Sequence, residues 1–247
     1  MTDHIFRSVD NEAELGLRLA SPRLVHNRLL AALPPSEYDL LANDLEECDL
    51  RTGEVLQALH RPSQYVWFPV SGMVSLRAEV TPGSGIAIAT VGSDGVAGIV
   101  GVNDAALSPL SAVVTIGGAA LRIETEQFQR VHSKSMVLKT LLCNAFESLL
   151  LQAGQSAVCC QTHLLEARLA RALLETRRCI GLDEFHLTHE LLSHSLGVRR
   201  VGVTKAATAL QRRQLISYSR GAILLLDVAG LAAAACSCYH ADRSYRK

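Results

Sequence analysis

Cationic and hydroxyl-bearing side chains in the C-terminal third of the chain are the strongest candidates for chemistry. Arg200, Thr204, Lys205 and Thr208 fall at helical spacing, so they share one face of a helix. Arginine can donate two hydrogen bonds to O6 and N7 of guanine, and one such pair discriminates between bases by roughly 1–3 kcal/mol. We therefore predict a face that reads DNA, with members Arg199, Arg200, Gly202, Thr204, Lys205 and Thr208, and with Arg220 close by.

Gly202 is unusual within this predicted helix, because glycine costs up to about 1 kcal/mol relative to alanine in a helix interior. One interpretation is that the missing side chain allows close approach to the DNA backbone. The other is a tolerated defect, and the sequence leaves both open.

The elements that must position this face read as a winged helix-turn-helix. Thr188 is a plausible N-cap for a first helix, and Gly197 ends that helix before a turn of three or four residues. Two short apolar strands then flank Ser219-Arg220-Gly221, a hairpin turn with a basic tip that could neutralise a phosphate. The predicted inward residues are Leu191, Leu192 and Leu196 in the first helix and Val203, Ala207 and Leu210 in the second. The alternative is a plain helical hairpin without DNA binding.

Net charge supports the DNA interpretation once the chain is divided. The whole chain has zero net charge, which hides an asymmetry between its ends. Residues 1–50 carry four arginines against ten acidic residues, a net of −6, whereas residues 163–220 carry ten cationic residues against five acidic ones, a net of +5. The predicted DNA-binding segment is therefore the basic one.

The seven cysteines are odd in number and scattered, which argues against a disulfide framework. The pairs Cys159-Cys160 and Cys236-x-Cys238 could be redox switches, but cysteines in apolar helices are usually packing residues. An iron–sulfur cluster needs four clustered thiolates, and Cys48 stands alone near the N-terminus. Haem ligation by His60 or His132 stays open. We predict no metal site.

Enzymatic chemistry is not expected. The chain has no Walker-type phosphate loop and no GxSxG motif, and residues 61–131 contain no histidine for a cupin-type metal centre. No catalytic residues are predicted.

The middle of the chain predicts an α+β fold. Ten of the 17 glycines lie between residues 53 and 118, and residues 74–80 alternate apolar and polar side chains, as do 85–91 and 113–123 less strictly. This pattern is typical of a jelly-roll barrel.

From about residue 126 to 179 the spacing becomes helical, with a heptad stripe and a second apolar face at Leu141, Phe146, Leu150 and Leu151. Such a helix would pack both on its own barrel and on a partner, although a core helix of a monomer has the same pattern. We predict that the heptad stripe forms a dimer interface. Its residues are Leu138, Leu142, Ala145, Leu149, Gln152, Ser156 and Cys159.

With barrel, long helix and winged motif in this order, the chain resembles the Crp/Fnr family, the cyclic-AMP receptor protein and its relatives. The resemblance covers residues 27–239, and its best local matches are HLLEARLARALLE (163–175) and the segment 187–221. It implies a homodimer joined along the long helix, whose recognition helices lie roughly 34 Å apart on a roughly palindromic site. Arg200 and Lys205 match base-reading positions, Arg199 and Thr208 match neighbouring contacts, and Thr188 matches a phosphate contact.

The sensor half departs from the family's cyclic-nucleotide pattern. The acidic residue of the Gly-Glu pair is missing in Val96-Ala97-Gly98-Ile99-Val100-Gly101, and the phosphate-binding arginine is missing in Leu110-Ser111-Ala112. The Thr-Ser pair that meets adenine aligns with Ala153-Gly154. Because a buried phosphate without a cation is costly, cAMP is not expected as the effector.

Together these observations predict a homodimeric, sequence-specific transcription regulator that binds double-stranded DNA, and RNA polymerase if it activates. The predicted parts are a β-barrel sensor domain with N-terminal helices (1–132), a dimerisation helix and hinge (133–180), and a winged helix-turn-helix domain (181–247). The effector is unknown. A cytoplasmic location is expected, because we expect no apolar stretch to be long enough to span a membrane and the N-terminus lacks a signal-peptide core. Two alternatives are a ligand-binding or adaptor protein that uses the basic domain for protein contacts, and a redox-sensing regulator that uses Cys159 and Cys160.

Overall fold

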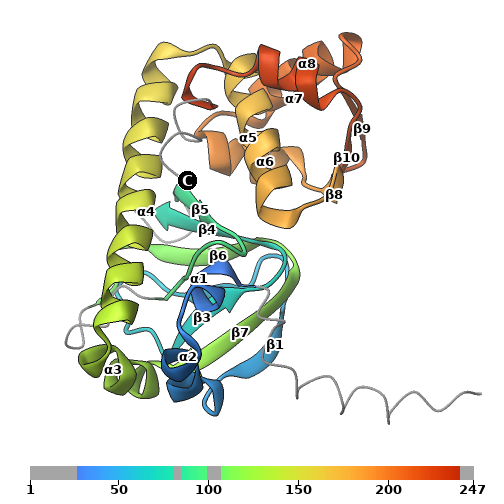
Figure 1. Ribbon diagram of the computed structural model, residues 1–247. Helices are drawn as coiled ribbons and strands as arrows, with labels where there is room; N and C mark the ends of the chain where they lie inside the picture. The colour runs from blue at the N-terminus through green and yellow to red at the C-terminus, as the bar shows by residue number, and fades with distance from the viewer. Residues whose placement is uncertain (1–26, 80–84, 99–106, 240–247) are drawn as a thin grey trace, which may run out of the picture.

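Two antiparallel sheets form the N-terminal half of the computed structural model, which describes residues 27–79, 85–98 and 107–239 (Figure 1). The first sheet has the order β1-β7-β3, and the second has the order β2-β6-β4-β5. Apolar residues of both sheets, including Trp67, Val74 and Val114, share one buried cluster between them. The strands are β1 (Glu46–Leu50), β2 (Val55–Gln57), β3 (Tyr65–Pro69), β4 (Met73–Ala78), β5 (Ile86–Val91), β6 (Ser111–Ile116) and β7 (Gly118–Glu124).

The predicted continuous strand over 113–123 is wrong in one respect, because it divides at Gly117 into β6 and β7, which belong to different sheets. The close approach of the end of β1 and of the loop before β4 explains the break. A Cβ on Gly118 would lie 2.5 Å from the carbonyl of Ser71, and one on Gly117 would lie 3.0 Å from the carbonyl oxygen of Leu50. Glycine therefore lets the chain cross from one sheet to the other.

Short helices cover the outer face of the first sheet. They are α1 (Arg28–Ala31), α2 (Pro35–Ala42) and α3 (Thr125–Lys134), and they share a core with Val66, Phe68 and Ile123 of the sheet. Asn27 fastens this layer: it is fully buried, its Oδ1 accepts from Leu29 N and Leu30 N, and its Nδ2 donates to Pro69 O and Gly95 O.

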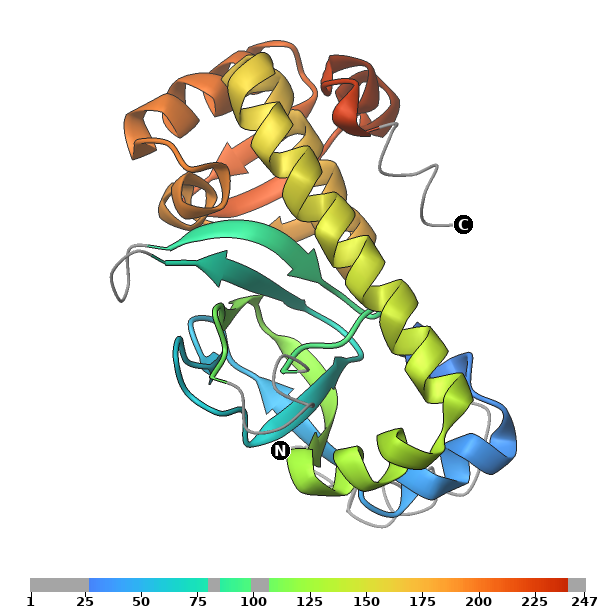
Figure 2. The same ribbon diagram turned by 90° about the vertical axis from the view of Figure 1, so that its left-hand side faces the viewer.

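The long helix α4 (Met136–Thr162) runs along the side of the sheets to the C-terminal domain (Figure 2). The predicted heptad stripe faces inward. Leu138 and Leu142 are 1% and 3% exposed in the core beneath the first sheet, Leu149 packs against the cluster between the sheets, and Gln152 Oε1 accepts from Thr90 N of β5. Leu138, Leu142, Gln152 and Cys159 of the stripe therefore pack on their own chain, whereas Ala145, Leu149 and Ser156 are half-buried, and the stripe as a dimer interface stays a prediction.

The second apolar face of α4 is the one that the chain leaves open. Phe146, Leu150, Leu151 and Val158 are 43%, 73%, 44% and 54% exposed. In a helix that is apolar on both sides, the sequence does not show which side packs on its own chain and which side stays open.

Among the described residues, α4 is the one helix long and apolar enough to span a membrane. The sheets occupy one side of it, so we attribute its apolar character to packing.

The C-terminal domain has its own core. Its elements are α5 (Leu165–Ile180), β8 (Glu184–His186), α6 (His189–Leu196), α7 (Arg200–Arg212), β9 (Ile216–Ser219), β10 (Ala222–Leu225) and α8 (Val228–Ala234). The strands form an antiparallel sheet in the order β8-β10-β9. Helix α5 contributes Leu169, Ala170, Leu173 and Leu174 to this core, so it packs as part of the domain rather than as a free connector.

The predicted order of a β-rich N-terminal domain, a long helix and a C-terminal winged helix-turn-helix is confirmed, although the two sheets do not close into a barrel. The two domains also touch directly. Helix α6 packs against β5, Arg178 forms an ion pair with Asp94, and Gly92 lies so close to Cys179 that a Cβ would meet its backbone at 2.9 Å.

Candidate nucleic-acid interface

The helix-turn-helix is built as its sequence predicts. The Thr188 side chain accepts a hydrogen bond from Leu191 N at 3.2 Å, so it caps the first turn of α6. Gly197 ends α6 in the left-handed conformation, with φ 63°. Helix α7 then begins at Arg200, three residues later. The Thr188 hydroxyl, while capping, keeps its own proton for a further acceptor such as a phosphate.

Helix α7 has one buried and one solvent-facing side. Val203 and Leu210 are completely buried in the domain core, together with Ala206 and Ala207. Most solvent-facing residues carry a cation, a hydroxyl group or an amide. They are Arg200, Thr204, Lys205, Thr208, Gln211 and Arg212, with the apolar Val201 among them. The predicted reading residues Arg200, Thr204, Lys205 and Thr208 therefore lie together on the exposed side, with Arg199 exposed at the N-cap.

Gly202 does not belong to that exposed side. A Cβ on Gly202 would meet Leu165 Cδ2 of α5 at 3.0 Å, so the residue faces the start of α5. Close packing of α7 on α5 thus gives a structural reason for this glycine, and its contact with DNA stays a prediction. Glycine here lets two helices of the same domain approach each other.

Thr204 is tied to the neighbouring helix. Its Oγ1 lies 3.0 Å from His189 Nδ1, and the His189 ring stacks on Tyr218 of β9 with centroids 4.1 Å apart. This contact links the start of α6, the middle of α7 and the wing. Sequence reasoning missed His189 and Tyr218, because their stacking depends on three elements meeting in space.

Burial, followed by the nearby Arg200 guanidinium, lowers the pKa of His189. The neutral ring is therefore favoured in the folded protein, and the unfolded chain binds more protons once the pH falls below the ordinary histidine value of about 6.5. We expect the free energy of unfolding to decrease between about pH 7.5 and pH 5.5, and to decrease less in His189→Gln. Urea denaturation at both pH values measures this. His194→Gln on the same helix is the control, and an equal pH dependence in both variants would contradict the role of His189.

The wing is a two-residue β-turn. Ser219 pairs with Ala222 across β9 and β10, and Arg220 and Gly221 both have positive φ, at 49° and 90°. A Cβ on Gly221 would lie 2.5 Å from His186 Nε2 of β8, so only glycine fits there. The turn leaves the Arg220 side chain exposed at the tip, as predicted.

Two arginines near the end of α7 differ in role. Arg213 Nη1 lies 2.6 Å from Glu166 Oε1, which anchors the end of α7 to α5. Arg212 is exposed.

The strand β8, which pairs with β10 and completes the wing sheet, has no counterpart in the sequence prediction, because its three residues are too few to show a period.

The predicted sensor positions Leu110, Ser111 and Ala112 carry no cation themselves, although Arg77 of β4 pairs with Ser111 across the strands. Ser111 donates a hydrogen bond to the Glu79 carboxylate, and Ala112 is buried between the sheets. Gly98 has φ 80° and lies against Tyr65 O, while Ile99, Val100 and Gly101 fall outside the described residues. A cavity of about 80 Å³ lies instead between the two domains, where Thr90, Gln152, Arg171 and Glu175 are among the lining residues.

The other candidate side chains are placed as follows. Cys159 is buried and faces Cys236 and Cys238, whereas Cys160 is exposed, so the two neighbours do not form one redox pair as the sequence suggested. His60 is exposed in a turn, and His132 stacks on Phe128 at the surface of the first core. Neither histidine belongs to a cluster of metal-ligand side chains among the described residues.

The C-terminal domain matches a known domain family. Residues 167–234 match the Crp-like helix-turn-helix domain. No curated protein matches the sequence. The fold is similar to that of FixK2 from Bradyrhizobium japonicum, at 17% identity over 78% of this chain and 98% of that one, with a TM-score of 0.66.

Two further solved structures share this fold. One is a transcriptional regulator of the CRP/FNR family from Thermus thermophilus, at 23% identity over 77% of this chain and 98% of that one, with a TM-score of 0.64. The other is described as a putative transcriptional regulator of the crp/fnr family from Eubacterium rectale, at 17% identity over 85% of this chain and 98% of that one, with a TM-score of 0.64. The likeness spans both domains and the helix between them.

Proposed function

We propose that this chain is a DNA-binding transcription regulator of the Crp/Fnr type, and that it acts as a homodimer that places α7 of each subunit in the major groove of a roughly palindromic site. The observation that carries this proposal is the exposed side of α7. Its cations and hydroxyl groups lie opposite the buried residues, and Arg220 projects from the wing beside it. Arg200 and Lys205 would contact bases, while Thr188 and Arg220 would contact phosphates.

The open face of α4 supports the homodimer. Glu147 is the only charged residue among the exposed residues of this helix, and the apolar ones lie along its length. A second copy of the same helix would cover such a face in a two-fold dimer, as in a coiled coil. The face consists of Thr140, Asn144, Phe146, Glu147, Leu150, Leu151, Gly154, Ala157, Val158 and Gln161.

The effector proposed here is a molecule other than cAMP. The triplet Leu110-Ser111-Ala112 lacks the arginine of the family's phosphate site, and the Ser111 hydroxyl donates to Glu79, which supports this, since a cyclic phosphate needs a charged or donor-rich partner. We expect an effector to act where both domains meet, because the cavity there has lining residues from β5, α4, α5 and α6. The protein is proposed to work in the cytoplasm without catalysis, and to contact RNA polymerase if it activates transcription. The competing proposal is that the protein is an adaptor that binds other proteins through its basic domain.

Selection of bound duplexes from a random-sequence pool tests the DNA-binding proposal. We expect an inverted repeat whose half-sites are centred about 10–10.5 base pairs apart, or a multiple of that spacing. Affinity for the selected duplex should fall steeply with salt, because each phosphate contact releases counterions. Repeating the selection with and without reductant and candidate nucleotides tests sensing. Recovery of no common sequence, with weak binding at low salt, would favour the adaptor.

A further inference from the structure

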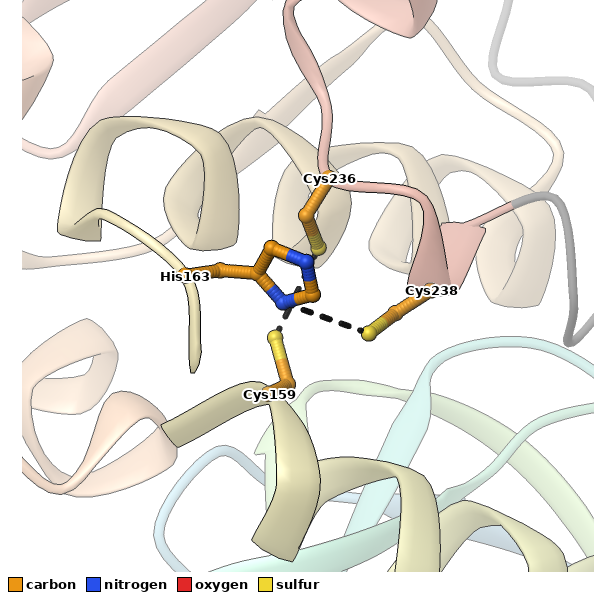
Figure 3. Close-up of side chains that lie close together, drawn as sticks. All are labelled: Cys159, His163, Cys236 and Cys238. Atoms are coloured by element: carbon orange, nitrogen blue, oxygen red, sulfur yellow. Dashed lines mark hydrogen bonds between the residues drawn. The ribbon is translucent and has the colours of Figure 1, made fainter. Parts of the chain in front are cut away.

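Four side chains that commonly bind metals meet where α4 ends. Cys159 lies in the last turn of α4, His163 is its C-cap, and Cys236 and Cys238 follow α8 near the end of the described chain (Figure 3). Their ligand atoms all lie within 4.8 Å of one another. Cys159 Sγ is 3.5 Å from Cys236 Sγ, and Cys238 Sγ is 3.5 Å from His163 Nδ1. Two segments far apart in sequence, 159–163 and 236–238, thus bring three thiols and one imidazole to a single point.

We propose that these four side chains bind one zinc ion. Structural zinc sites are tetrahedral, and three cysteines with one histidine form one of the common ligand sets. Zinc–sulfur bonds of about 2.3 Å place the sulfur atoms of a tetrahedron about 3.8 Å apart. The 3.5 Å separation of Cys159 and Cys236 is close to that value, so small side-chain movements would complete the site.

The surroundings suit a closed, structural site. Cys159, Cys236 and Cys238 are 1%, 4% and 2% exposed, and they form a small cluster of their own with Ala167. Thiolate ligands in this position would be shielded from solvent and from larger oxidants. The soft donor set also favours zinc over hard cations such as magnesium or calcium, which prefer oxygen ligands.

Polar neighbours would orient the ligands. Gln155 Nε2 donates to Cys238 Sγ at 2.7 Å. With His163 Nδ1 facing the sulfur atoms, Ser237 Oγ lies 3.4 Å from the other ring nitrogen, Nε2, where it can accept its proton. Cys236 N donates to Ala167 O of α5, which fixes the segment that carries both C-terminal cysteines. Cys160, in contrast, is exposed, and its sulfur accepts from Arg168 instead.

The position of the site gives it a consequence for DNA binding, and this part rests on the proposed function. Zinc would join the end of the dimer helix to both ends of the DNA-binding domain, at the hinge before α5 and at the segment after α8. It would therefore set the angle at which α7 is presented. We expect the zinc-loaded protein to bind its operator about tenfold more tightly than the metal-free protein, within the usual range of coupling between two sites.

Metal analysis of the full chain, purified untagged under reducing conditions, tests the site itself. We expect about one zinc per chain in the wild type and in Cys160→Ser, and less than about 0.2 in the double variant Cys236→Ser/Cys238→Ser after exposure to a competing chelator. Cobalt substitution should give the visible absorption of a tetrahedral, thiolate-bound ion in the wild type and in Cys160→Ser, but not in the double variant. Circular dichroism verifies that the double variant keeps its helices.

Several results would overturn the zinc proposal: no bound zinc in the wild type, equal zinc in the double variant, or a disulfide joining Cys159 to Cys236 in place of metal. DNA affinity is measured separately on wild-type protein before chelation, after it and after zinc is restored. A protein that binds zinc but selects no DNA sequence would contradict the proposed function and leave the site intact. A protein that selects DNA equally well with and without zinc would contradict the coupling.

Discussion

Leu150→Glu is expected to convert the dimer into monomers and to lower affinity for an inverted-repeat operator by at least about a hundredfold. Leu150 is 73% exposed on the open face of α4, halfway along the helix, and it faces away from the sheets. A two-fold interface duplicates the change, so two carboxylates would enter one apolar surface and lose solvation without gaining a partner. Each monomer would then bind one half-site alone, and the gain of about 10²–10⁴ from linked binding would disappear.

Sedimentation equilibrium and titration of the operator measure the two effects of Leu150→Glu. Leu40→Glu is the matched control, because Leu40 is also exposed, at 54%, on helix α2 of the N-terminal half. The same change there should leave both the dimer and the affinity intact. A Leu150→Glu protein that stays dimeric would place the interface on another surface.

The DNA-binding domain is predictable from sequence because its signals are local. A capping threonine, a terminating glycine and apolar residues at helical spacing each act within a few residues, and all of them lie where the sequence placed them around Thr188, Gly197 and Val203. The wing hairpin follows from Arg220-Gly221 in the same way. Gly202 could not be explained from local sequence, because the side chain that leaves no room for a Cβ there, Leu165, belongs to another helix.

Features that depend on contacts between distant residues are not predictable from local sequence patterns. Helix α4 is apolar on two sides, so its pattern predicted an interface but not which face the sheets cover. The division of β6 from β7 at Gly117 depends on the end of β1 at Leu50 and on the loop at Ser71. The cluster of Cys159 with Cys236 joins residues 77 positions apart. Its only local signals were the spacings Cys-x₃-His and Cys-x-Cys, which in a sequence alone are indistinguishable from packing residues.

Arg200→Ala is expected to weaken binding to the selected operator by about 10- to 100-fold and to relax the preference at one base pair of each half-site. Arg200 is exposed at the first turn of α7, the end that enters the major groove in helix-turn-helix proteins. Loss of a bidentate contact to guanine costs roughly 1–3 kcal/mol, and the cost vanishes on duplexes that lack that guanine. Arg220→Ala should behave differently, since a phosphate contact at the wing weakens all duplexes alike and its loss lowers the salt slope by about 1.

Selection from a random pool and salt titration with each variant separate these two roles. Arg61→Ala in the N-terminal half removes the same charge from an exposed position away from α7, so it serves as the control for net charge. We expect its operator preference to match that of the wild type. If Arg200→Ala and Arg61→Ala selected the same sequence with the same affinity, base reading by the first turn of α7 would be wrong, and the reading residues would have to be sought at Lys205 and Thr208.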